Sequence, residues 1–268
     1  MQSLQSAAMR AAARPLFAGW EETLIESCLD GSMGEILADD AAAPRLAAAQ
    51  LGDFGFLAGD AQDPAAEDLV RAVLAHAPHG YVLAVPQSEA WAGCIQRACP
   101  QGWQRLPRYA TKKDPSAFDR GHLEALAAAC PAPAVLEPLG PEAYARTRAE
   151  EWSRDLTAMY ADYEAFAAQS LGVVAVRNGE IVAGASGYSR YRGGIEIQID
   201  TRSDCRRQGL AAACAARLLL NCLDRGLYPS WDAANLASLS LAEKLGYSFS
   251  HAYAAYLLVP PGRKAVLA

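Results

Sequence analysis

The chain has 268 residues, of which 52% are hydrophobic and 20% are charged, and its formal net charge is −6. This composition excludes an intrinsically disordered protein and supplies enough core material for one large domain or two ordinary ones. The acidic balance argues against a general nucleic-acid-binding protein, because such proteins spread Lys and Arg over the contact face. The sequence has no run of eighteen apolar residues, so it contains no candidate transmembrane helix.

The cysteines and histidines do not form the pattern of a metal or disulfide framework. Seven cysteines occur without a Cys-x-x-Cys pair, and the four histidines are too scattered to complete a metal set. We therefore expect no metal, and we interpret the thiols as reduced, buried groups in a cytoplasmic protein. Cys205 has a second interpretation, because a helix that starts beside it would lower its thiol pKa.

The first 130 residues predict an α/β domain in which helices and strands alternate. Strands are predicted at 35–38, 53–57, 81–85 and 103–111, and helices at 3–29, with a break near Pro15, and at 44–51, 64–76, 89–99 and 120–130. The proline-rich bridge at 131–133 marks the predicted boundary between a domain at 1–130 and a domain at 134–268.

The second domain, 134–268, is predicted to contain a three-stranded antiparallel unit. A strand at 135–139, a helix at 141–151 and a helix or helix pair at 152–170 come first. Asn178-Gly179 then separates apolar runs at 171–177 and 180–188, and Asn-Gly between apolar runs is the strongest short-range hairpin signal. The run at 194–201 alternates apolar and polar residues as a half-buried strand does, and the Ala- and Leu-rich run at 210–225 predicts a buried helix before Gly226.

The turn between the strand at 194–201 and the helix at 210–225 predicts an anion site. A helix start leaves backbone N–H groups unpaired, and its positive dipole end and the guanidinium groups of Arg206 and Arg207 favour a di- or triphosphate. The turn lacks both the Gly-x-x-x-x-Gly-Lys-Ser/Thr loop of nucleoside triphosphate sites and the Gly-x-Gly-x-x-Gly dinucleotide fingerprint. A different phosphate carrier is therefore expected.

The same turn resembles a known signature. Arg206-x-x-Gly209-x-Ala211 is similar to the Arg/Gln-x-x-Gly-x-Gly/Ala signature of the GNAT superfamily of acyl-CoA N-acyltransferases, and the segments at 228–232, 235–238 and 243–247 resemble that family's fifth strand and last helix. The resemblance implies an α/β (α+β) GNAT fold with a mixed, mostly antiparallel sheet in the C-terminal domain. It also implies a subfamily with an additional N-terminal domain, which is either a degenerate GNAT-like half or an unrelated α/β cap that helps to form the acceptor pocket.

The resemblance also implies acetyl-CoA, or coenzyme A, as the co-substrate. It places the pantetheine against Ile199 to Thr201 and matches Asn235 to a position that often touches the cofactor, although Asn is also a favoured helix N-cap. The expected cofactor-binding residues are Ile199, Thr201, Arg206, Arg207, Gln208, Gly209, Leu210, Ala211, Asn235 and Ser238.

Two acids on the strand at 194–201 are candidates for the general base. Glu196 is the first choice and Asp200 the second, because a carboxylate there would accept the proton of an attacking amine; the alternative is a solvated strand face. Ala242 stands where the family commonly has a tyrosine in the last helix. The proton for the departing thiolate would then come from Tyr228, Tyr247, Tyr253 or water.

The predicted function is an N-acetyltransferase that transfers an acetyl group from acetyl-CoA to a primary amine of a small molecule by direct attack on the thioester. One alternative is a non-catalytic acyl-CoA-binding sensor or interaction module, which Ala242 fits. Another is a GNAT-like transferase with a different acyl donor, and the acidic balance argues against an aminoacyl-tRNA in that role. We expect a small-molecule amine acceptor as partner, with neither nucleic acid nor a membrane, and leave a homodimer open.

Overall fold

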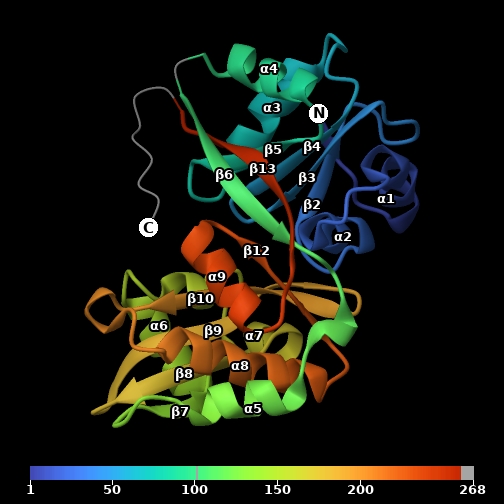
Figure 1. Cartoon of the computed structure of the whole chain (residues 1–268). Coiled ribbons are helices and arrows are strands. Elements are labelled where there is room, and N and C mark those ends of the chain that lie inside the picture. The colour runs from blue at the N-terminus through green and yellow to red at the C-terminus, as the bar shows by residue number, and fades with distance from the viewer. Residues whose placement is uncertain (101, 261–268) are drawn as a thin grey trace. The chain divides into compact units, whose positions relative to one another are not determined.

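The computed structural model describes residues 1–100 and 102–260 and divides the chain into two compact units (Figure 1). The first unit comprises Met1–Arg108 and the chain from Ala252 onward, and the second comprises Tyr109–His251. The predicted boundary at 131–133 therefore lies inside the second unit. The reason is that α5 (Arg120–Ala128) lies beside α8 (Leu210–Leu223), and its Leu123 and Ala127 belong to the same buried cluster as the apolar side chains of α8.

The first unit follows the order strand, two helices, three strands, helix, strand, helix and strand. Its elements are β1 (Gln2–Ser3), α1 (Ala7–Ala13), α2 (Thr23–Asp30), β2 (Glu35–Ala38), β3 (Leu46–Leu51), β4 (Phe54–Gly59), α3 (Ala66–Ala75), β5 (Val82–Pro86), α4 (Glu89–Ala98) and β6 (Trp103–Thr111). Its strands lie in the order β1-β2-β3-β4-β5-β13-β6, in which β1 to β4 are antiparallel and β4 and β5 are parallel. Both β6 and β13 (Phe249–Leu258) have residues in each unit.

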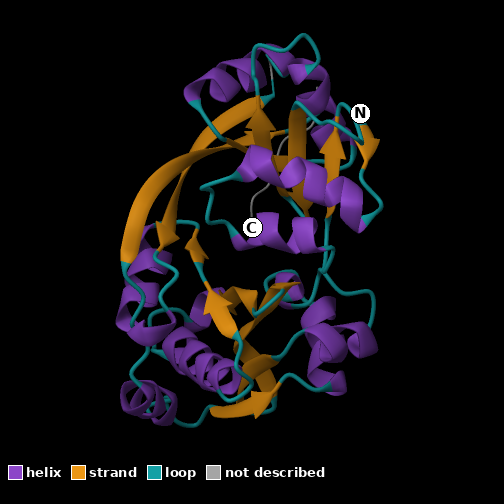
Figure 2. Ribbon diagram, turned by 90° about the vertical axis from the view of Figure 1, so that its right-hand side faces the viewer, coloured by secondary structure: helices purple, strands orange, loops and turns teal. Residues whose placement is uncertain are grey.

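The second unit repeats this order. Its elements are β7 (Val135–Pro138), α6 (Pro141–Ala149), α7 (Tyr163–Gln169), β8 (Gly172–Arg177), β9 (Glu180–Tyr191), β10 (Gly194–Thr201), α8, β11 (Tyr228–Ser230), the short β12 (Asp232–Ala233), α9 (Leu236–Lys244) and then β13. Its sheet has the order β11-β10-β9-β8-β7, and β10 and β11 are its parallel pair. Figure 2 shows the strands and helices of both units by type. Of the two interpretations of the N-terminal domain, the structure thus supports the GNAT-like half.

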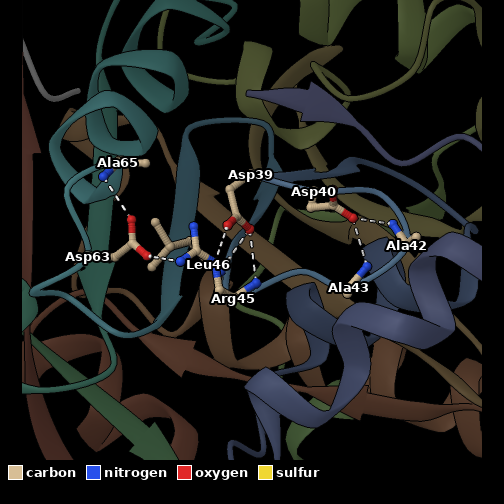
Figure 3. Close-up of polar contacts among 8 residues, drawn as sticks. All are labelled: Asp39, Asp40, Ala42, Ala43, Arg45, Leu46, Asp63 and Ala65. Carbon is tan, nitrogen blue, oxygen red and sulfur yellow. Dashed lines mark hydrogen bonds and ion pairs between the residues drawn. The ribbon is translucent and has the colours of Figure 1, made fainter.

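The prediction of a helix at 44–51 is wrong, because this segment forms the strand β3. Its Ala-rich composition favours a helix, but every residue of Leu46–Leu51 is buried between β2 and β4. The Asp39 carboxylate accepts the backbone N–H groups of Arg45 and Leu46 at 2.9 and 3.0 Å, which fixes the start of the strand (Figure 3). Tertiary contacts therefore override local propensity here.

Most of the remaining predicted elements agree with the structure within a few residues. The helical region predicted at 3–29, with a break near Pro15, forms the separate helices α1 and α2, and the region predicted as helical at 152–170 is α-helical only in α7. The strands predicted at 35–38, 103–111 and 194–201 have the bounds of β2, β6 and β10. Asn178 and Gly179 join β8 to β9 with φ values of 52° and 80°, as an Asn-Gly hairpin turn requires. The segment at 152–170 contains the 3₁₀ turn Arg154–Leu156 and the helix α7.

No helix among the described residues has both the length and the apolar composition needed to cross a membrane.

Candidate active site

The strand β10 is paired on both sides over only part of its length. Its parallel pairing with β11 runs from Gly194 to Glu196, whereas its antiparallel pairing with β9 continues to Thr201. Within the described chain, the edge of β10 that faces away from β9 has no strand partner after Glu196. The ladder with β9 also shifts register between Glu196 and Ile197. The two parallel strands therefore part after Glu196, and an extended ligand can bind along the exposed edge.

The predicted pantetheine residues Ile199 and Thr201 lie on this exposed edge. The carbonyl oxygen of Thr201 already accepts a hydrogen bond from Nε of Arg206 at 3.2 Å. This contact ties the end of β10 to the turn that precedes α8. The edge and the turn are thus one continuous surface rather than two separate sites.

The turn before α8 presents backbone donors to solvent. Gly209 is the N-cap of α8 with φ +91°, and Arg207 also has a positive φ, +62°. Among the described residues, no acceptor contacts the backbone N–H groups from Arg207 to Ala212, and no side chain caps the helix. A Cβ built at Gly209 would meet nothing within 4 Å. The helix start is therefore open to an anion, which its N–H groups and its dipole favour.

The charges around this turn are also suited to an anion. Arg202 holds Asp204 with two hydrogen bonds, at 2.8 and 3.1 Å, so that this acid is neutralised, and the contact lowers the pKa of Asp204. Arg206 and Arg207 are exposed, and neither forms an ion pair with a described residue. Cys205 is only 3% exposed and packs in the apolar cluster under α8, which supports its interpretation as a core residue.

Two further residues predicted to bind the cofactor have structural partners. The side chain of Asn235 caps α9 by accepting the N–H of Ser238 at 2.9 Å. The hydroxyl oxygen of Ser238 accepts the indole N–H of Trp231 at 3.1 Å. The N-cap interpretation of Asn235 is thus confirmed, and a cofactor contact of Asn235 or Ser238 stays a prediction.

Glu196 lies in a row of buried polar side chains at the point where β10 and β11 part. Ser189 on β9 and Ser230 on β11 are its neighbours in register, so the three side chains share one face of the sheet. Both serines are fully buried, and Glu196 is 6% exposed. One carboxylate oxygen of Glu196 accepts the N–H of Asp232 at 2.8 Å. A solvated strand face is therefore the wrong interpretation of Glu196.

Asp200 lies further along the same face of β10, roughly 13 Å from Glu196 at about 3.3 Å per residue. Its carboxylate accepts a hydrogen bond from the Gln198 amide at 2.9 Å. Burial raises its pKa to about 6; the charge of Asp155 acts in the same direction, and Gln198 and Arg206 oppose the shift. Because Glu196 lies where the strands part and Asp200 does not, Glu196 remains the first candidate for the base.

The tyrosines considered as proton donors for the thiolate are engaged elsewhere. Ala242 is fully buried in α9. Tyr247 is buried and donates its hydroxyl proton to the carbonyl oxygen of Pro229. Tyr228 donates to the carbonyl oxygen of Lys112 at 3.2 Å, and burial raises its pKa to about 12. Tyr253 belongs to the other unit.

The sequence analysis did not single out Ser189, Ser230 or Lys113, whose Nζ donates to the hydroxyl oxygen of Ser230 at 2.9 Å. Local pattern carries no signal for this group, because Lys113 and Ser230 are 117 positions apart in the sequence. The parallel strand after α8 was the one available hint, since its polar residues lie beside those of β10.

The repeated strand order, the parted parallel strands and the open Arg-Gly turn define a protein of the GNAT class. The model of the GNAT acetyltransferase family matches residues 14–256, so the chain belongs to that family.

Solved structures support this assignment over nearly the whole chain. A GCN5-related N-acetyltransferase-like protein from Streptococcus suis is 44% identical, with a TM-score of 0.87 over 95% of this chain and 100% of that one. A tandem GNAT protein from the clavulanic acid biosynthesis pathway is 11% identical, with a TM-score of 0.54 over 97% of this chain and 94% of that one, and so shares the fold alone.

A curated relative matches a smaller part of the chain. The uncharacterized N-acetyltransferase YdfB of Bacillus subtilis is 30% identical over 93 residues, which is 34% of this chain. The match spans 36% of that relative's own length.

Proposed function

We propose that the protein transfers an acetyl group from acetyl-CoA to a primary amine of a small molecule by direct attack on the thioester. The observation that carries the proposal is the exposed edge of β10 after Glu196, which leads into the uncapped start of α8 at Gly209. An extended pantetheine fits such an edge, and a pyrophosphate fits such a helix start.

The N–H groups from Arg207 to Ala211 and the side chain of Arg206 would hold the pyrophosphate, and the backbone of Ile199 to Thr201 would align the pantetheine. The bound coenzyme supplies the activated acetyl group as a thioester. Glu196 accepts the proton from the amine as the nitrogen bonds to the acetyl carbon and the carbon–sulfur bond breaks. The leaving thiolate is a fair leaving group, since a thiol has a pKa near ~8.5.

Release of free thiol from acetyl-CoA, measured with and without a panel of amines, tests this proposal together with calorimetry of coenzyme A binding. We expect micromolar to millimolar coenzyme A affinity and thiol release that depends on the acceptor. Failure to bind coenzyme A would contradict the assignment of the turn before α8.

The second candidate function is a non-catalytic acyl-CoA sensor. Ala242 favours it, because the last helix offers no phenol to the departing thiolate. Tight coenzyme A binding without turnover of any acceptor would support the sensor. The buried Glu196 at the parting of the strands favours the enzyme.

A further inference from the structure

Lys113 is a half-buried cation without a counter-ion. Its Nζ donates to the hydroxyl oxygen of Ser230 at 2.9 Å, and no described carboxylate forms an ion pair with it. The described partner of this ammonium group is therefore a neutral hydroxyl oxygen, and a negatively charged partner would bind it more strongly. A carboxylate of a ligand is such a partner.

The position of Lys113 is fixed by its neighbours. The hydroxyl of Thr111 donates to the carbonyl oxygen of Trp231 at 2.6 Å. The N–H of Lys112 donates to the carbonyl oxygen of Ser248 at 2.8 Å. The carbonyl oxygen of Lys112 accepts the Tyr228 hydroxyl at 3.2 Å. Three contacts thus hold the backbone just before Lys113, which distinguishes it from an ordinary surface lysine.

Lys113 also lies next to the candidate base. Ser230, which it contacts, is the register neighbour of Glu196, and adjacent strands are separated by about 4.8 Å. On the other side of Glu196, the hydroxyl oxygen of Ser189 is fully buried and has no hydrogen-bond partner among the described residues. An ammonium group, a carboxylate and a buried hydroxyl that has no partner among the described residues therefore lie close together where β10 and β11 part.

We propose that Lys113 binds a carboxylate of the acetyl acceptor, whose amine lies at Glu196. The acceptor is then an amino acid or a similar small zwitterion, with its amine and its acid a few bonds apart. This inference rests on the proposed function and specifies its substrate class. Ser230 holds the ammonium group of Lys113 in place, and the acceptor carboxylate is its charged partner.

The test is acceptor-dependent thiol release with matched sets of acceptors: the standard amino acids, and for each its C-terminal amide and its decarboxylated amine. The wild type is expected to prefer the amino acid. Lys113→Met should raise KM for the amino acid about 10- to 100-fold, as expected for a lost charge-assisted contact, and should leave KM for the amide and the amine unchanged. Lys113→Arg should retain most of the preference.

Lys112→Met is the matched control, because Lys112 is exposed and its side chain has no partner among the described residues. Amine acetylation without any preference for the carboxylate would overturn the inference and leave the proposed function standing. An equal fall in kcat for every acceptor in Lys113→Met would also overturn it, since the ammonium group would then act on the departing thiolate.

Binding of the amino acids to the protein with coenzyme A present, followed by thermal shift, provides a readout that does not need turnover. The inference is supported if an amino acid stabilises the wild type, its amide does not, and the stabilisation is lost in Lys113→Met. This result would support the inference even if the transfer reaction fails. Equal stabilisation by both compounds would overturn it.

Discussion

The two units place a turn at the same point of the same strand order, yet only one turn is open to an anion. In the first unit, between β4 and α3, Asp63 accepts the N–H of Ala65 at 2.9 Å and pairs with Arg45 at 2.9 Å (Figure 3). Glu67 and Asp68 add two more acids to the first turn of α3. In the second unit the first turn of α8 has no acid.

Gly59, the last residue of β4, and Gly209, the N-cap of α8, differ in the space around them. A Cβ at Gly59 would collide with the carbonyl oxygen of Arg45, whereas one at Gly209 would enter open space. Both residues have a positive φ, so each needs glycine for its backbone conformation. Only at Gly209 does the missing side chain leave room for a ligand.

The strands before the two turns complete the contrast. β4 presents Phe54 and Phe56, while β10 presents Glu196 and Asp200. The backbone order is therefore repeated without the chemistry. The first unit has acids before and within the first turn of α3, and β4 carries apolar side chains. Coenzyme A binding and catalysis are predicted for the second unit alone.

The largest expected effect is at Glu196, which has no counterpart on β4. Glu196→Gln should lower kcat by about 10² to 10⁴ and leave coenzyme A affinity nearly unchanged, because the amide cannot accept the amine proton. Steady-state kinetics beside calorimetry measures both quantities. Asp200→Asn is the comparison variant, and a larger fall in kcat for Asp200→Asn would transfer the role to that residue.

The next effect is at the open turn. Gly209→Val should weaken coenzyme A binding about 100-fold, because the new side chain occupies the space before the α8 donors and a β-branched residue disfavours a positive φ. Calorimetry measures the affinity. Gly179→Val is the matched control, since Gly179 has φ +80° and open space in the β8–β9 turn; equal affinities in the two variants would refute an anion site at Gly209.

Asp200 gives β10 a pH dependence that β4 lacks. Its folded pKa of about 6 lies above its ordinary value of 3.8, so its contribution to stability is fully present below pH 3.8 and is lost as the pH rises to 6. This difference in pKa corresponds to about 3 kcal/mol at most. Chemical denaturation between pH 4 and pH 7 should show this loss in the wild type and not in Asp200→Asn; identical profiles would contradict it.

The smallest expected effect is at the closed turn. Asp63→Ala should lower the free energy of unfolding by about 1 kcal/mol, because the turn before α3 loses the hydrogen bond from the N–H of Ala65 and the ion pair with Arg45, and should leave coenzyme A affinity unchanged. Thermal denaturation and calorimetry measure the two quantities. Asp68→Ala removes an exposed acid from the first turn of α3 and serves as control. A gain of coenzyme A binding in Asp63→Ala would contradict this expectation and would show that the Asp63 carboxylate alone prevents binding there.

Several elements could be predicted from local pattern alone. The alternation of β10, the glycine of the turn before α8, the Asn178-Gly179 hairpin and the Asn235 cap follow from periodicity, φ preference and capping chemistry, which act over a few residues. The uncapped start of α8 was predictable for the same reason, and its role as an anion site stays a prediction.

The tertiary structure decided what depends on distant neighbours. β3 is a strand because β2 and β4 bury it on both sides, although its composition favours a helix. The segment at 109–133 belongs to the second unit because α5 packs on α8. Strand register places Glu196 beside Ser230, and Lys113 contacts Ser230 although the two residues are 117 positions apart in the sequence. No local pattern encodes either of these contacts.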